Sequence, residues 1–140
     1  MHEWQVKIGA DMAKVLGFGG VFVKVADTKA YTQWYSRALG VDITDWNTMM
    51  WHSDGQGFTM LSPFSADTEY FKPSTHRFMI NLRVDDTRAL MERAKREGAE
   101  IVGEIEDNEF GIFGWFIDPE GLKVELWQAP EASDSNGAAT

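Results

Sequence analysis

The sequence contains no cysteine, and this absence removes several kinds of chemistry at once. Without thiols the chain has no disulfide, no thiolate nucleophile and no thiolate metal site. It also lacks an apolar run near the roughly 20 residues that span a bilayer, and its N-terminus lacks a basic segment followed by an apolar core. We therefore expect a cytoplasmic protein that has no signal peptide and does not bind membranes.

Basic residues are scarce as well. The chain has 13 Lys and Arg against 22 Asp and Glu, which gives a net charge of −9. An acidic chain repels nucleic acids and anionic membranes, so we expect neither as a partner. Apolar residues are abundant: 44% of the chain is hydrophobic, including 6 Trp and 9 Phe. This content excludes global disorder, and 140 residues suit one domain or two small halves that share a core.

The stretch 114–128 predicts a strand, a tight turn and a second strand. In the turn Asp-Pro-Glu-Gly at 118–121, proline presets φ and glycine relieves crowding at the exit. Beyond the turn, polar or aromatic residues alternate with aliphatic ones: Lys123, Glu125 and Trp127 against Val124 and Leu126. Such alternation predicts a strand with one apolar face and a carboxylate on the other.

The order of predicted elements occurs twice in the chain. A strand at 21–25 precedes Asp27, a helix to 39 and Gly40, and a strand at 78–84 precedes Asp86, a helix to 97 and Gly98. The segments 25–30 (VADTKA) and 84–89 (VDDTRA) align. Three strands follow each helix, at 41–43, 48–52 and 58–61 in the first half and at 101–102, 112–117 and 122–127 in the second. Two copies of one unit predict a pseudo-twofold pair, with helices on one face and the other faces curled into a cup.

Three segments lie outside the repeated units. Residues 1–17 predict an N-terminal helix, because Trp4, Ile8, Met12 and Leu16 fall four apart. Residues 63–76 predict a long loop that either closes over a site or simply connects the halves. The small polar tail 129–140 predicts disorder. We also expect 107–114 to be a mobile acidic connection, and the apolar stripe of the first helix to be buried: Tyr31, Trp34, Tyr35, Ala38 and Leu39.

With its doubled unit and its ending Asp-Pro-Glu-Gly…Val-Glu-Leu at 118–126, the sequence resembles the vicinal-oxygen-chelate superfamily. That superfamily includes glyoxalase I, bleomycin-resistance proteins, extradiol dioxygenases and fosfomycin-resistance enzymes. The resemblance covers residues 18–128. It implies an α+β fold in which two paired βαβββ modules, 18–62 and 77–128, form a cup-shaped mixed sheet. It also implies a homodimer, since relatives of this size usually pair.

The resemblance also implies where a metal would bind. Metal-dependent members use His or Gln, then Glu, in the first module, and His, then Glu, in the second. Carried over, these positions fall near Gly20, Met60 and Met79, and on Glu125. Only Glu125 matches, and a thioether is too soft for the Mg, Mn, Ni or Zn that these enzymes use. We therefore predict no cofactor and no metal at the usual positions. The alternative is a non-standard metal site that recruits His52 or His76.

Glu125 is the candidate catalytic residue. Inside the cup its carboxylate can orient an amine or hydroxyl of a ligand, or act as a base with a raised pKa. It can equally be a leftover of an ancestral metal site, paired with Lys24 or Arg83. Asn81 can supply a hydrogen-bond donor and an acceptor, and Arg83 can clamp an anion. The predicted ligand-binding residues are Phe22, Lys24, Trp51, His52, Met60, Met79, Asn81, Arg83 and Trp127.

Three interpretations of function follow. The first is a glyoxalase/bleomycin-resistance-like protein that binds a small organic molecule in the cup without the usual metal. The second is a glyoxalase-like lyase or isomerase whose non-standard site includes Glu125. The third is an accessory subunit whose cup is partly filled by its own aromatic side chains. Four tryptophans bear on this choice, because they serve either as a ligand wall or as core and dimer packing: Trp46, Trp51, Trp115 and Trp127.

Overall fold

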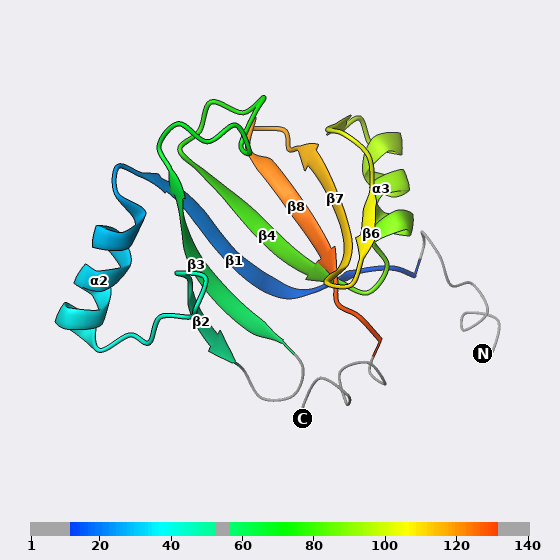
Figure 1. Ribbon diagram of the computed structural model, residues 1–140. Helices are drawn as coiled ribbons and strands as arrows, with labels where there is room; N and C mark the ends of the chain where they lie inside the picture. Colours follow the sequence, from blue (N-terminus) through cyan, green and yellow to red (C-terminus); the bar gives the residue numbers. More distant parts are fainter. Residues whose placement is uncertain (1–11, 53–56, 132–140) are drawn as a thin grey trace.

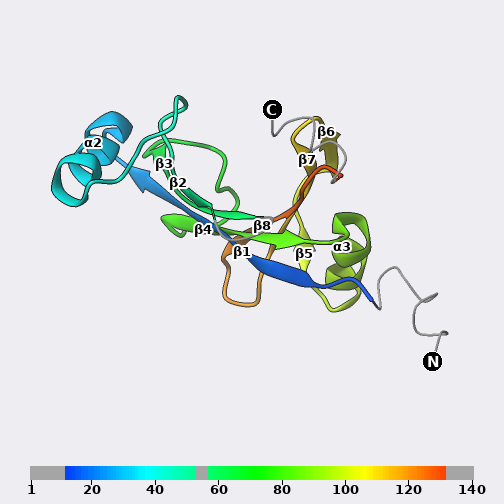
Figure 2. The ribbon, with the colours of Figure 1, turned by 90° about the horizontal axis from the view of Figure 1, so that it is seen from below.

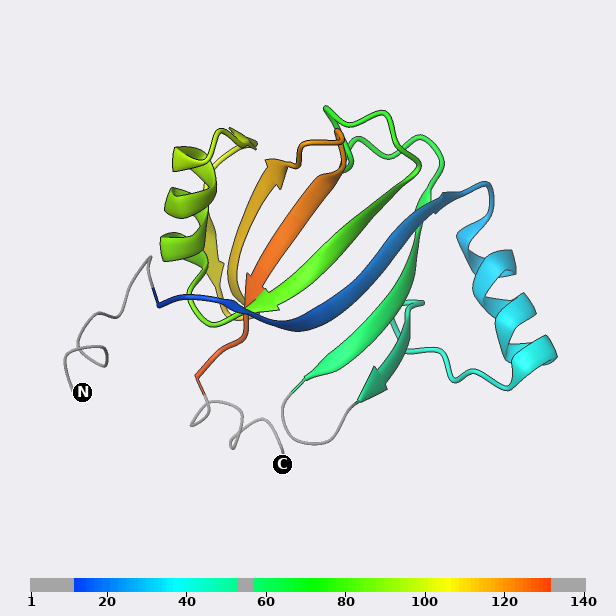
Figure 3. The ribbon, with the colours of Figure 1, turned by 180° about the vertical axis from the view of Figure 1, so that it is seen from behind.

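The strands of the chain form a single curved sheet, shown from two sides in Figures 1 and 3. The computed structural model describes residues 12–52 and 57–131. The strand order is β2-β3-β1-β4-β8-β7-β5, and β6 pairs with β7. The strands are β1 (Val15–Val25), β2 (Met49–His52), β3 (Phe58–Ser65), β4 (Phe78–Val84), β5 (Glu100–Ile101), β6 (Glu106–Asn108), β7 (Gly111–Ile117) and β8 (Lys123–Gln128). No helix in the described ranges is long and apolar enough to cross a membrane.

The two helices confirm the predicted repeat. Helix α2 (Thr28–Leu39) follows β1, and helix α3 (Thr87–Arg96) follows β4. Asp27 accepts a hydrogen bond from the third residue beyond it at 2.9 Å, and Asp86 does the same at 3.0 Å. Both aspartates are therefore N-caps, as predicted. Gly40 ends α2 with φ of 72°, a left-handed conformation that glycine adopts without steric cost.

The two modules meet at the centre of the sheet. Strands β1 and β4 pair antiparallel, while β3 runs parallel to β1 and β8 runs parallel to β4. This register places four residues in one row across the sheet: Met60, Gly20, Asn81 and Glu125. Three of these are the positions that the family resemblance identified, and Asn81 stands in the row where Met79 was expected. Met79 instead lies opposite Phe22, in the adjacent row.

The predicted alternation of β8 is confirmed by its two faces. Val124 and Leu126 are buried on the outer face, in a core that includes Val84 and, from α3, Leu90 and Met91. Lys123 and Glu125 are buried on the inner face. The turn before β8 also forms as expected, because Asp118 accepts backbone hydrogen bonds at 2.9 and 3.0 Å and φ of Gly121 is 87°.

The predicted N-terminal helix is wrong at its C-terminal end. Residues 1–11 of that prediction lie outside the described residues. Val15 and Leu16, however, belong to β1, and Val15 pairs with Val84 of β4. Pairing with β4 satisfies the backbone of this segment, so the chain is extended where the four-residue spacing predicted a helix. The glycines at 17, 19 and 20 lie within the same strand.

The predicted buried stripe of α2 is also wrong. Trp34 is 52% exposed and Leu39 is 66% exposed, and the residue of α2 that is fully buried is Thr32. Figures 1 and 2 show α2 standing apart at one end of the sheet, whereas α3 lies along the other end. A helical period identifies an apolar face, but it does not say whether the same chain covers that face.

The segment between the modules differs from the prediction at its start. Strand β3 continues to Ser65, so the connection is 66–77 and not 63–76. This connection crosses the top of the sheet in Figure 1, and its Phe71 is fully buried against Phe22 and Met79. The predicted mobile connection at 107–114 is instead a hairpin of β6 and β7, in which Asn108 pairs with Gly111.

Candidate functional site

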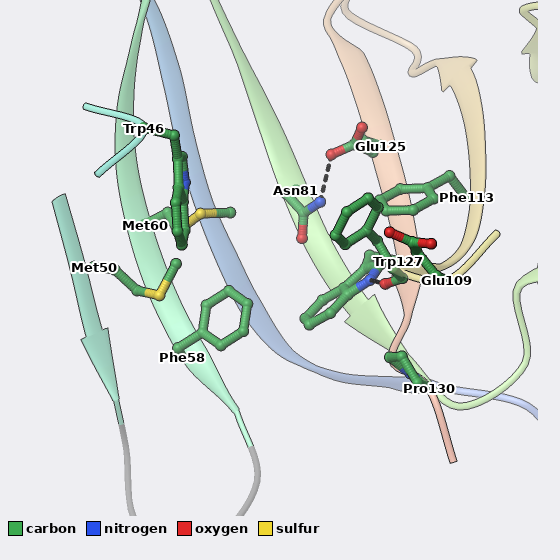
Figure 4. A pocket seen from close by; sticks show the side chains of 11 residues that line it. Trp46, Met50, Phe58, Met60, Asn81, Glu109, Phe113, Glu125, Trp127 and Pro130 are labelled. Carbon is green, nitrogen blue, oxygen red and sulfur yellow. Dashed lines mark hydrogen bonds between the residues drawn. The ribbon is translucent and has the colours of Figure 1, made fainter. Parts of the chain in front are cut away.

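A cavity of about 660 Å³ lies between the two modules on the inner face of the sheet. Its volume falls within the roughly 300–1,000 Å³ of typical small-molecule pockets. Figure 4 shows two walls facing each other. The first module supplies Trp46, Met50, Phe58 and Met60, and the second supplies Asn81, Glu109, Phe110, Phe113, Glu125, Trp127 and Pro130. The walls meet where the rings of Phe58 and Trp127 lie 5.0 Å apart.

The carboxylate of Glu125 is the most elaborately bonded group of the cavity. Only 4% of the residue is exposed. Its Oε1 accepts a hydrogen bond from Asn81 Nδ2 at 2.6 Å. Its Oε2 accepts one from Trp115 Nε1 at 3.0 Å and another from the hydroxyl of Tyr70. Three donors from β4, β7 and the 66–77 connection therefore hold one carboxylate in a fixed orientation.

Burial has the largest effect on the pKa of Glu125. Removal from water raises the pKa of this carboxyl, and the hydrogen bonds from Tyr70, Asn81 and Trp115 and the charge of Lys123 oppose that rise only in part. The carboxylate in turn raises the pKa of the Tyr70 hydroxyl, which burial raises first. Tyr70 is thus a fixed hydrogen-bond donor, and Glu125 is the group that can exchange a proton.

Lys123 is held away from the cavity. Its ammonium donates to the backbone oxygen of Tyr70 and lies 4.9 Å from the centre of the Tyr70 ring. Burial lowers the pKa of this amine, and the charge of Glu125 opposes the change. Lys123 therefore secures the 66–77 connection above Glu125, and it is not among the residues that line the cavity.

Asn81 has one amide atom that the described residues leave unpartnered. Its nitrogen donates to Glu125, but its buried Oδ1 has no hydrogen-bond partner there. Figure 4 shows this oxygen turned away from Glu125, towards the space between Met60 and Trp127. Gly19 makes room for it, since a Cβ at that position would lie 1.9 Å from Oδ1. A buried acceptor without a donor costs free energy, so this oxygen makes the floor of the cavity more polar than the protein itself compensates.

Four of the residues predicted from sequence line the cavity together. These are Met60, Asn81, Glu125 and Trp127. Three others are placed under or against the 66–77 connection. Phe22 and Met79 are buried with Phe71, and the Lys24 ammonium lies 5.3 Å from the centre of the Phe71 ring. The connection therefore covers one part of the inner face and leaves the other open as the cavity.

The remaining predicted residues lie outside the cavity lining. Trp51 is 48% exposed, and His52 is exposed and packs edge-on against Phe58 at 5.8 Å. The guanidinium of Arg83 lies over Gly17 and Gly57. His76 has its Nε2 3.2 Å from the backbone oxygen of Glu120, in the turn before β8.

Sequence reasoning missed several lining residues. Trp46 was named only as a possible wall residue, and Trp115, placed in the same group, instead bonds Glu125 from the core. Tyr70 reaches Glu125 across 55 residues of sequence, which no local pattern reveals. Strand alternation was sufficient to predict Phe58 and Phe113. Each lies two residues from another lining or core residue on its strand and therefore on the same face. The missed lining residues are Met50, Phe58, Glu109, Phe110, Phe113 and Pro130.

The donor set of this site does not fit the divalent metal of the superfamily. Gly20 has no ligand atom, and a Cβ there would lie 2.2 Å from the backbone oxygen of Met60, so no side chain is accommodated. Met60 and Met79 offer thioethers, and the oxygens of Glu125 already accept three hydrogen bonds. No group of three or more His, Cys, Asp or Glu within 12–52 and 57–131 is arranged to hold a metal.

Comparison with solved structures supports the fold. The methylmalonyl-CoA epimerase of Mycobacterium tuberculosis matches with 20% identity, 90% of this chain and 93% of that chain, and a TM-score of 0.57. A Streptomyces coelicolor methylmalonyl-CoA epimerase variant in complex with 2-nitronate-propionyl-CoA matches with 13% identity, 84% and 100% coverage, and a TM-score of 0.64. A glyoxalase/bleomycin resistance protein/dioxygenase superfamily member from Vibrio splendidus 12B01 matches with 18% identity, 84% and 99% coverage, and a TM-score of 0.53. At these identities the likeness extends to the fold alone.

Comparison at the level of sequence gives the family. No curated protein matches the chain. A family model described as a glyoxalase-like domain matches residues 20–127. This range includes the strands β2 to β7 and all of β8 except its last residue. The chain therefore belongs to the glyoxalase-like domain family of the vicinal-oxygen-chelate superfamily.

Proposed function

We propose that this protein binds a small organic molecule in the cavity between its modules, without the divalent metal of its superfamily. The observation that carries the proposal is the composition of the cavity. Its walls are largely aromatic and methionine side chains, and its polar groups converge on Glu125 and Asn81. A mainly apolar hollow with a few oriented polar groups is the usual form of a ligand site.

A thermal-shift screen tests this proposal. Small aromatic and aliphatic compounds of each charge are expected to raise the melting temperature, because a ligand bound only by the folded state stabilises it. The effect is expected to disappear in Met60→Trp, whose larger side chain would fill the cavity. Leu16→Trp is the matched control, since Leu16 is 47% exposed on β1 and outside the lining. A screen in which no compound shifts the wild-type protein would sink the proposal.

A second candidate is a proton-transfer reaction, of the lyase or isomerase type, with Glu125 as the base. The observation that favours it is a buried carboxylate with a raised pKa at a cavity wall. Epimerases are also among the structures that the chain resembles. Compounds that bind would be incubated in heavy water, and deuterium incorporation would be followed by NMR. Incorporation that needs the protein, and is lost in Glu125→Gln but kept in Glu104→Gln, would establish the activity. Incorporation unchanged in Glu125→Gln would remove this residue from the mechanism.

A further inference from the structure

The charges that line the cavity all have one sign. Glu125 and Glu109 both line it, the first buried and the second exposed. Among the described residues, no Lys, Arg or His is part of the lining. The two basic residues that we predicted to bind the ligand lie outside the lining. Lys24 packs against the ring of Phe71, and Arg83 lies over Gly17 and Gly57. The potential in the cavity is therefore negative, and an anionic ligand would meet no compensating charge.

Two hydrogen-bond acceptors at the floor of the cavity also lack a full set of partners. No basic side chain in the described part of the chain forms an ion pair with Glu125, and Lys123 directs its ammonium to the Tyr70 backbone. Asn81, which is 3% exposed, has its unpartnered Oδ1 buried against Gly19 beside the same space. A buried carboxylate whose charge Lys123 offsets only in part favours a ligand that brings donors and positive charge.

The walls around these acceptors are suited to the same kind of ligand. Indole and phenyl rings surround the space, and such rings attract cations through their negative faces. The rings that line the cavity are Trp46, Phe58, Phe110, Phe113 and Trp127. They equally bind the carbon skeleton of an amine by the hydrophobic effect. Aromatic walls combined with an acidic floor thus select for charge and for apolar surface together.

We propose that the ligand is an organic ammonium, a protonated amine on an aromatic or aliphatic skeleton. Its N–H groups donate to the Glu125 carboxylate, and its skeleton packs among the aromatic rings. Glu109 attracts the cation from the rim of the cavity. This assignment rests on the proposed function, because it specifies the class of molecule that the same cavity takes. It does not depend on whether Glu125 also transfers a proton.

Three probes of matched shape test the assignment. Naphthylethylamine, naphthylethanol and naphthylpropanoate carry a positive, a neutral and a negative group near neutral pH. Titration calorimetry on the full chain is expected to give an amine affinity at least about tenfold above that of the alcohol, with the carboxylate weakest. Binding of the alcohol as tight as that of the amine would overturn the ammonium assignment and leave the proposed function standing. Binding of none of the three would overturn the ammonium assignment, and the proposed function would fall with it only if the thermal-shift screen also gave no shift.

Charge variants locate the selectivity. In Glu125→Gln the preference for amine over alcohol is expected to fall at least about tenfold, while the alcohol still binds. Glu109→Gln, at an exposed position, is expected to lower the amine affinity about two- to fivefold without an effect on folding. Glu104→Gln removes the same charge from an exposed residue outside the lining and is the matched control. If Glu104→Gln reduces the preference as much as the two lining variants do, the attraction comes from the net charge and the assignment fails.

Discussion

The two modules share an order of elements but differ in how they are packed. In the second module, α3 covers the outer face of the sheet, and Leu90 and Met91 are buried against Val84 and Leu126. In the first module, α2 presents Trp34 and Leu39 to solvent. The contributions to the cavity differ in the same way. All its polar lining residues come from the second module, and the first supplies Trp46, Met50, Phe58 and Met60.

This difference shows how a duplicated unit can divide its tasks. A buried carboxylate needs neighbours that do not move, because its hydrogen bonds must be kept at a fixed geometry. The second module, with a filled core behind its strands, provides that support for Glu125 and Asn81. The first module contributes apolar side chains, whose contacts are not directional and tolerate a less closely packed framework.

The largest expected effect contrasts one substitution in the two modules. Leu126→Ala removes a side chain that is 3% exposed in the outer core and is expected to lower the free energy of unfolding by about 2–5 kcal/mol. Leu39→Ala removes the same group from a position 66% exposed on α2 and is expected to cost less than about 0.5 kcal/mol. Urea unfolding of both variants measures the contrast. Equal losses would mean that the two modules are packed equally well.

A second contrast concerns two glycines of β1. In Gly19→Ala the new Cβ would lie 1.9 Å from Asn81 Oδ1 and force that amide to move, at an expected cost of about 1–3 kcal/mol. In Gly17→Ala the nearest atom is Arg83 Nη2 at 3.2 Å, on a flexible side chain, and we expect a loss below about 0.5 kcal/mol. Urea unfolding and the side-chain amide signals of Asn81 in NMR spectra check both. Unchanged amide signals in Gly19→Ala would contradict the described position of Asn81.

The third prediction concerns how the stability of the protein depends on pH through Glu125 in the second module. Burial raises the pKa of Glu125, so the folded state keeps a proton that the unfolded state has released above the ordinary value of 4.5. The free energy of unfolding therefore falls as pH rises from that value through the raised pKa. Glu125→Gln lacks this term. Its stability relative to wild type is expected to increase with pH across the window. A difference that stays constant with pH would show that Glu125 does not titrate abnormally.

The smallest effect on folding is expected at the open face of α2. We expect the chain to form a homodimer that covers this face, because Trp34 and Leu39 are large apolar residues left in solvent. Trp34→Glu is then expected to convert dimer to monomer in light scattering, with monomer stability changed by less than about 0.5 kcal/mol. Glu substituted at Trp51, which is 48% exposed on β2, is the control. A wild-type protein that is monomeric at all concentrations would refute the dimer.

Much of the fold follows from local signals in the sequence. The N-caps at Asp27 and Asp86, the turn before β8 and the alternation of Lys123 and Glu125 with Val124 and Leu126 each depend on a few neighbouring residues. The same alternation placed Glu125 on the inner face beside the cavity. The apolar stripe of α2 was also visible in the sequence. The sequence did not show, however, whether other residues of the same chain cover that stripe or leave it exposed.

The site was less accessible to prediction, for a physical reason. Strand alternation puts Phe22, Met79 and Asn81 on one face, but it does not say which of them the 66–77 connection covers. That depends on where Phe71 packs and on the bond between Tyr70 and Glu125, both of which join parts of the chain that are distant in sequence. Asn81, and not Met79, is the partner of Glu125 because the register of β4 against β8 aligns them.

The 66–77 connection has a kinetic consequence. Because it covers one part of the inner face, a ligand enters and leaves the cavity through the part that the connection leaves open. Trp46 and Phe110, which are 66% and 67% exposed, are the most exposed aromatic residues of the lining. A substitution there that raises the barrier to entry slows entry and exit by the same factor and leaves the affinity unchanged. Contacts deeper in the cavity, at Glu125 and the aromatic walls, change the affinity, and most of that change falls on the rate of exit.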